Sequence, residues 1–215
     1  MDCRRFLLVL LAAVASQGCM YFNGEELPRR EGPETIADPP VVTFEIGEVK
    51  LLRNGEPSQQ SAESIGSREL ANTLRIWESR GLIRDWGRRT ELSALPDYSL
   101  ALTGSQNEEG SVLAAYVTGL SLYLVPSSTT WHYDWQFVLT DLRSGASYRV
   151  PVERSASVWV HAVFLPVLPF GSLGQYNGHR DQALYVYTEL EKQGAFADAN
   201  PTEMAAPPPI EPESD

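Results

Sequence analysis

The sequence predicts an α+β fold, a two-layer sandwich in which a mostly antiparallel sheet of about five strands carries two helices on one face. Apolar and polar residues alternate over residues 133–153, which indicates a hairpin of that sheet. Apolar residues at helical spacing over residues 62–80 and 180–193 indicate the two helices. Together these patterns favour one layer of strands and one of helices.

The first elements follow from short patterns. Residues 41–52 read as a strand whose apolar phase shifts near Gly47, which predicts a β-bulge. Residues 62–80 read as a helix, and Gly81 stands where a left-handed residue commonly ends one. The apolar face of this helix is formed by Leu70, Leu74 and Trp77, with Ile65 beside it.

The middle of the chain reads as strands. Residues 97–103 alternate in polarity, which is typical of a half-buried strand, and residues 106–110 form a polar turn. Residues 112–125 are apolar on both sides, so we expect a long central strand there. The hairpin follows, and one of its faces should pack against the helices through Tyr133, Trp135, Phe137, Tyr148 and Val150.

Proline and glycine mark the limits of the last elements. Pro151 lacks a backbone N–H, so its strand should lie at a sheet edge or pair over only part of its length. The helix over residues 180–193 carries its apolar face on Ala183, Leu184, Tyr187 and Leu190, and Gly194 ends it.

An apolar segment at residues 155–174 allows three interpretations. The first is a buried strand followed by a loop over the core. The second is an exposed apolar surface in which Trp159, Phe164 and Phe170 face a partner or the membrane interface. The third is a pocket for a lipid or small molecule. Pro166 and Pro169 argue against a membrane-spanning helix.

The N-terminus has the layout of a secretory signal peptide at residues 1–18. Arg4 and Arg5 precede an apolar run at residues 6–15, and small or turn-forming residues lead to Cys19. The run is shorter than the roughly 20 residues that a spanning helix needs. We therefore expect cleavage before Cys19, the alternative being ordinary secretion with cleavage near Ala15.

This arrangement resembles the signal of bacterial lipoproteins, although Ser16 and Gln17 depart from the usual residues before the cysteine. The resemblance covers the first 19 residues and implies diacylglycerol and a further acyl chain such as palmitate on Cys19. The chain holds two cysteines, and Cys3 leaves with the signal. A single remaining cysteine cannot close an internal disulfide, but it can serve as an anchor. Met20, where an aspartate often marks inner-membrane retention, favours the outer membrane.

Composition limits the partners. The formal charge is −11, and removing Asp2, Arg4 and Arg5 with the signal takes it to −12. Such a surface repels nucleic-acid backbones and anionic headgroups, so attachment to lipid should depend on the acyl chains. The hydrophobic fraction of 43% supports a folded core.

The remaining boundaries follow from proline content. Residues 19–40 should form the lipidated N-terminus and a flexible tether, and residues 41–196 a single α+β domain. Residues 197–215 are acidic and proline-rich, so we expect a disordered tail. A docking peptide around residues 207–209 is the alternative for that tail.

The sequence contains no catalytic or metal-binding motif that we can identify. His132, His161 and His179 do not have metal-ligand spacing, and we expect no cofactor and no metal. Residues 171–174 lack the glycine of a nucleophile elbow. A relay through His132 and Asp134, two apart on one strand, is an alternative.

We expect a non-enzymatic lipoprotein of the bacterial envelope, anchored through Cys19, with its domain facing the periplasm. Its role would be structural or accessory binding in the envelope, with an envelope protein as a candidate partner. One alternative is a carrier or sensor for a small apolar ligand, with a cavity lined by Trp135, Phe137 or Trp159. The other is a hydrolase whose active site is assembled from distant residues.

Overall fold

The computed structural model describes residues 19–24, 27–28, 36, 38–122, 124–161 and 168–196. The predicted signal peptide and tail lie outside these residues. The fold is mixed α/β, with one open sheet of seven strands and, in the described part of the chain, three helices. The predicted class is therefore right in outline, whereas the expected numbers of about five strands and two helices are too low.

The sheet has the strand order β1-β7-β6-β5-β2-β3, with β4 also paired to β2. Most neighbours are antiparallel, but β2 runs parallel to both β5 and β4. Two tight turns hold residues that tolerate a positive φ. Asn54 and Gly55 both have positive φ between β2 and β3, and Gly145 has positive φ between β6 and β7. The strands are β1 (Cys19–Asn23), β2 (Val41–Arg53), β3 (Glu56–Pro57), β4 (Asp85–Gly87), β5 (Tyr98–Gly110), β6 (Ser127–Asp141) and β7 (Ser147–Val160).

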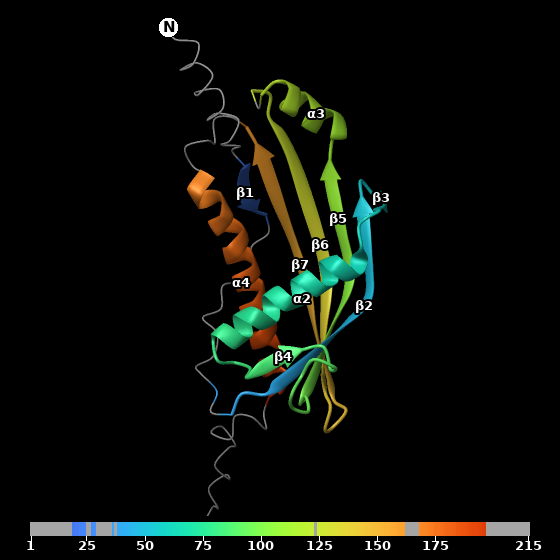
Figure 1. Ribbon diagram of the computed structural model, residues 1–215, viewed down its shortest axis with the longest axis vertical. Coiled ribbons are helices and arrows are strands. Elements are labelled where there is room, and N and C mark those ends of the chain that lie inside the picture. Colours follow the sequence, from blue (N-terminus) through green and yellow to red (C-terminus); the bar gives the residue numbers. More distant parts are fainter. Residues whose placement is uncertain are drawn as a thin grey trace, which may run out of the picture.

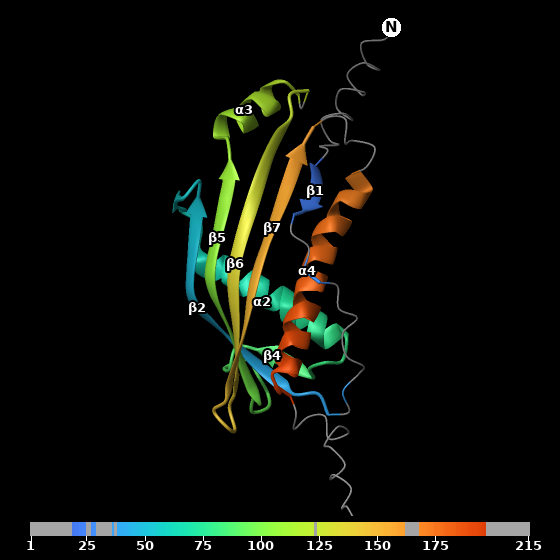
Figure 2. The ribbon, with the colours of Figure 1, turned by 180° about the vertical axis from the view of Figure 1, so that it is seen from behind.

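Helices α2 (Ala62–Ser79) and α4 (Leu168–Lys192) lie on the same face of the sheet (Figure 1). The opposite face of β5 and β6 is not covered by any helix of the described part (Figure 2). The core between the two layers includes Trp77 and Tyr187, whose rings meet edge to face at 5.3 Å. No helix among the described residues is both long and apolar enough to cross a membrane.

Several predictions from local pattern are confirmed. Helix α2 spans the expected residues and buries Leu70, Leu74 and Trp77. The β2–β5 register shifts between Ile46 and Val49, which is the bulge expected near Gly47. In the hairpin, the side chains of Trp135, Phe137 and Val150 are buried, while Tyr133 and Tyr148 are partly buried against the core.

Pro151 lies where its missing N–H is harmless. Strand β1 pairs with β7 only from Ala156 to Val160, so no strand of the described residues pairs with the edge of β7 beside Pro151. Two residues away, the N–H of Arg149 points to this edge and donates to Gln193 Oε1 at 3.2 Å. Backbone groups alternate along a strand, so the nitrogen of Pro151 faces the same open edge. The predicted partial pairing of this strand is confirmed.

The predicted polar turn at residues 106–110 is wrong, because β5 continues through these residues to Gly110 and pairs with β6 over that length. The predicted central strand at residues 112–125 is also wrong. Val112–Leu120 forms helix α3, and Ser111 caps it by accepting a hydrogen bond from the Ala114 N–H at 3.1 Å. A short apolar run has no polar–apolar period that separates strand from helix. The serine cap followed by two alanines favours the helix.

The prediction for residues 155–174 is only partly right. Its beginning belongs to β7, as the buried-strand interpretation supposes. Helix α4, however, begins at Leu168, well before the predicted start at residue 180. Pro169 falls in the first turn, where the missing N–H breaks no helical hydrogen bond.

The predicted tether over residues 19–40 also needs correction. Cys19–Asn23 forms strand β1, antiparallel to the end of β7. Leu27 and Ile36 pack against the core, and Ile36 is 6% exposed. A segment with several prolines and few apolar residues can still be held against a domain when single apolar side chains pack into its core. The described parts of this segment are therefore fixed to the domain.

A glycine in β5 gives a test of this sheet. Gly104 has a φ of +123°, and a Cβ there would collide with the Asp134 carbonyl on β6. Gly104→Ala should lower the free energy of unfolding by about 2–3 kcal/mol or more. Gly145→Ala is the control, because φ is +76° but the space around it is open. It should cost only about 1 kcal/mol of backbone strain. Urea unfolding of both variants measures the difference, and equal losses would contradict this β5–β6 pairing.

Candidate functional site

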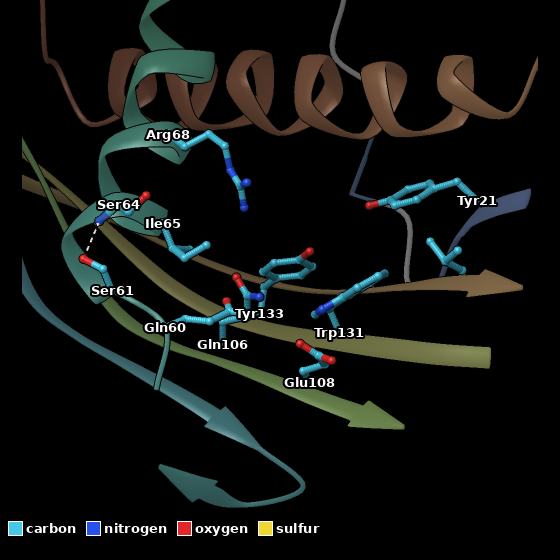
Figure 3. Close-up of a pocket in the computed structure, with 11 residues that line it drawn as sticks. Tyr21, Gln60, Ser61, Ser64, Ile65, Arg68, Gln106, Glu108, Trp131 and Tyr133 are labelled. Atoms are coloured by element: carbon cyan, nitrogen blue, oxygen red, sulfur yellow. Dashed lines mark hydrogen bonds between the residues drawn. The ribbon is translucent and has the colours of Figure 1, made fainter. Parts of the chain in front are cut away.

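A groove of about 570 Å³ opens between the first half of α2 and the helix-covered face of the sheet. Figure 3 shows Tyr133 and Trp131 on the strands, with Tyr21 of β1 at one end and Arg68 extending from α2 towards them. The lining residues are Tyr21, Gln60, Ser61, Ser64, Ile65, Arg68, Gln106, Glu108, Trp131, Tyr133 and Val158. Segments far apart in the sequence thus meet in one mixed aromatic and polar site.

Alternation along β6 produces the aromatic wall of the groove. Trp131, Tyr133 and Trp135 share one face of the strand. Trp135 is 1% exposed under the helices, whereas Tyr133 and Trp131 are only partly buried. The same face therefore changes from core to groove along the strand, because α2 crosses the sheet at an angle and leaves this end open (Figure 1).

Two of the carboxylates near the groove are already paired, whereas Arg68 makes no ion pair with the described residues. Glu63 pairs with Arg88 at 3.0 Å, and Glu108 pairs with Arg53 at 2.8 Å. Among the described residues, Arg68 makes no ion pair, although it is exposed and directed into the groove (Figure 3). The site can therefore receive an acidic group beside its aromatic side chains.

A buried ion-pair cluster lies beside the aromatic wall and contacts Tyr133. Glu69 Oε1 is 3.0 Å from Arg154 Nη2 and 3.4 Å from His179 Nδ1. It also accepts a hydrogen bond from Gln182 Nε2 at 3.1 Å. The Arg154 guanidinium lies 4.4 Å from the ring centroid of Tyr133 in a cation–π contact. The cluster thus joins α2, α4 and β7, and Arg154 connects it to Tyr133 in the aromatic wall.

The electrostatics keep Glu69 ionised. Burial by itself raises the pKa of its carboxyl, but His179, Arg154 and Gln182 together lower that pKa to about 2. Burial also raises the pKa of the Tyr21 and Tyr133 hydroxyls, although the Arg154 charge opposes it. A carboxylate whose pKa is lowered this far is a poor general base at neutral pH.

The sequence-predicted site residues do not converge on the groove. Cys19 begins β1, and Trp159 lies near the end of β7 with 44% of its surface exposed. Phe164 lies outside the described residues, and Phe170 falls within α4, where only the backbone is described. The proposed relay partners His132 and Asp134 lie on the other face of β6, and His132 stands 3.6 Å from Glu109.

Sequence reasoning missed the Glu69–Arg154 cluster, although two signals pointed to it. Glu69 adjoins the apolar face of α2, where a charged side chain needs a partner. Arg154 continues the inward alternation of Val150 and Val152 along β7. Both positions predict a buried charge, but nothing in the sequence shows that the two charges meet.

We compared the chain with known proteins. No protein-family model and no curated protein matches it. Among solved structures, a Xanthomonas campestris protein of family DUF330 is 12% identical, with a TM-score of 0.37, covering 79% of this chain and 95% of that one. The PelC dodecamer from Paraburkholderia phytofirmans is 13% identical, with a TM-score of 0.27, covering 75% and 98%.

A putative neuraminyllactose-binding hemagglutinin homolog from Helicobacter pylori is 11% identical, with a TM-score of 0.36, covering 78% of this chain and 91% of that one. All three TM-scores are below 0.5, so we draw no inference from these likenesses.

The buried cluster predicts a specific acid sensitivity. Because the folded-state pKa of Glu69 is about 2 against an ordinary 4.5, its stabilising effect is complete above pH 4.5 and is lost as the pH falls towards 2. Between pH 6 and pH 3 the wild type should lose about 2 kcal/mol more stability than Glu69→Gln. Urea unfolding across this range measures the difference.

Glu63→Gln on the same helix is the matched control, because Glu63 lies at the surface. It should show the acid sensitivity of the wild type. If Glu69→Gln lost as much stability between pH 6 and pH 3 as the wild type does, Glu69 would not be the ionised centre of the cluster.

Proposed function

We propose that this protein is a lipid-anchored, non-enzymatic binding protein of the bacterial cell envelope. Acylated Cys19 holds it in the membrane, by preference the outer membrane, with the domain in the periplasm. The anchor is supported by the signal-like residues 1–18 and by the absence of a second cysteine after them. Two or more acyl chains give stable attachment where one does not.

The groove supports the binding role. It places the aromatic side chains Tyr21, Trp131 and Tyr133 beside Arg68, which makes no ion pair with the described residues. Aromatic residues and arginine contribute most to recognition surfaces, because they bury a large area at low entropic cost. We therefore expect a partner segment that offers an apolar or aromatic group together with a carboxylate or another anionic group.

The alternative functions have less support. Trp135 and Phe137 belong to the core, and neither they nor Trp159 lines the groove, so an apolar-ligand carrier lacks its expected cavity there. A hydrolase would need a nucleophile beside a base. The described lining of the groove holds serines but no histidine or cysteine, and its carboxylate, Glu108, is already paired with Arg53. The nearby Glu69 carboxylate is already held by Arg154 and His179.

The anchor can be tested by replacing Cys19. Cys19→Ala should release the protein from the membrane fraction and remove the acyl mass from the intact chain. Cys3→Ala is the matched control, because Cys3 should leave with the signal peptide and its loss should change neither result. A wild-type chain without added acyl mass would refute the anchor.

The binding role can be tested by photo-crosslinking in cells. A photoreactive residue at Ser64, in the groove, should form an adduct with a defined partner, whereas one at the exposed Ser147, on the helix-free face, should not. Arg68→Glu should reduce the adduct about tenfold by reversing the charge offered to an acidic group. Arg75→Glu, exposed on the same helix but outside the groove, should leave it unchanged. Equal adducts at both positions, or equal effects of the two arginine variants, would exclude the groove as the binding site.

A further inference from the structure

Helix α3 and the turn after it expose apolar side chains on nearly all sides. Leu113 is 72% exposed, Leu120 71% and Leu124 71%. The other exposed members of this set are Val112, Tyr116, Val117, Leu122 and Val125. We call residues 111–122, 124 and 125 the apolar tip. Scattered exposed leucines are ordinary, but a continuous group of this kind marks a surface that is covered in use.

The apolar tip lies in an uncharged part of an otherwise charged chain. No aspartate, glutamate, lysine or arginine occurs between Glu109 and Asp134, although 21% of the whole chain is charged. The net negative charge of the chain, −11, therefore has no contribution from the tip. An uncharged surface can approach anionic headgroups without the repulsion that the acidic parts of the chain would meet.

Local hydrogen bonds satisfy much of the polarity of the tip. Ser111 Oγ accepts from the Ala114 N–H at 3.1 Å, and Thr118 Oγ1 donates to the Ala114 carbonyl at 2.8 Å. Ser121 Oγ donates to the Thr118 carbonyl at 3.0 Å and accepts from the Val125 N–H at 3.0 Å. Polar groups satisfied in this way enter a low-dielectric environment at less cost.

The sheet register brings the start of β1 to the same end of the domain. Cys19 pairs with Val160, the last residue of β7, and Val160 pairs with Ser127, the first residue of β6. Ser127 comes two residues after the end of the apolar tip in the chain. Figure 1 shows α3 beyond the ends of β5 and β6, at the end of the sheet where β1 lies.

We propose that the apolar tip inserts into the same membrane leaflet that holds the acyl chains of Cys19. This inference rests on the proposed anchor for its geometry, because an acylated Cys19 brings this end of the sheet to the bilayer. A helix of nine residues is about 14 Å long, so it would lie in the interfacial region and not span it. Tyr116, and Trp159 near the end of β7, are suited to the headgroup level.

The test uses fluorescent probes on the full-length, acylated protein. With Cys19 blocked by lipid, Leu113→Cys or Leu120→Cys supplies the only free thiol of the mature chain for an environment-sensitive dye. Vesicles of phosphatidylethanolamine and phosphatidylglycerol carry a nitroxide quencher on the acyl chains. Leu142→Cys is the matched control, since Leu142 is also an exposed leucine (42%) but lies in the hairpin at the opposite end of the sheet.

Dyes at positions 113 and 120 should shift to the blue and lose most of their emission to the lipid quencher, whereas the dye at position 142 should do neither. Equal quenching at the three positions, or none at positions 113 and 120, would overturn the inference. Cysteine crosslinks between copies at positions 113 or 120, without lipid quenching, would also overturn it and would assign the tip to a contact between copies.

A second measurement separates this inference from the anchor itself. Full-length protein with Cys19→Ser cannot be acylated, yet it should still float with vesicles weakly and independently of salt. Leu113→Asp with Leu120→Asp should reduce that flotation about tenfold, because charges replace buried apolar surface. Intact mass reports acylation in the parent chain. If the parent chain carries the acyl mass but its tip does not insert, only the inference about the tip is contradicted. If the acyl mass is absent, the proposed anchor is contradicted.

Discussion

The long antiparallel ladder of β5, β6 and β7 is the constraint on which the rest of this structure depends. Its register assigns the side chains of β6 to two faces. On the helix-covered face, Leu139, Phe137 and Trp135 fill the core, and Tyr133 and Trp131 line the groove. The same ladder, extended by β1, brings Cys19 to the end of the sheet that carries α3. A shift of one residue would move the aromatic side chains to the uncovered face.

The Glu69–Arg154 pair links the two layers. It joins α2 to β7, while His179 and Gln182 bring in α4. A buried ion pair is only weak evidence of stability, because desolvation opposes the attraction between its charges. Removing one partner is costly, however, since an uncompensated charge then stays buried. The cluster therefore ties α2 to both β7 and α4 beside the groove.

The pattern of apolar and polar residues predicted the elements that bury one face and expose the other. Helix α2, the hairpin of β6 and β7, the bulge near Gly47 and the edge position of Pro151 are all observed as expected. The pattern failed at residues 112–120, which form an exposed helix, because apolarity ordinarily indicates burial. It also failed to show strand β1, since pairing partners distant in sequence leave no local signal.

The groove and the buried cluster were beyond sequence reasoning for a related reason. Tyr21, Arg68 and Tyr133 come from β1, α2 and β6, and they meet only because the sheet order brings those elements together. Sequence patterns show which face a residue occupies, but not which residue stands opposite across a layer. The predicted lipidation of Cys19 depends instead on a linear signal, so the fold adds only the position of that residue relative to the domain.

The central claim is that the end of the domain bearing Cys19 and α3 faces the membrane. Hydrogen–deuterium exchange of the acylated protein in vesicles, compared with the Cys19→Ser chain in buffer, tests it most directly. Our account predicts slowed exchange of backbone amides over residues 111–125, with residues 142–146 unchanged at the opposite end. Slowed exchange over residues 142–146 instead, or identical exchange at both ends, would contradict it.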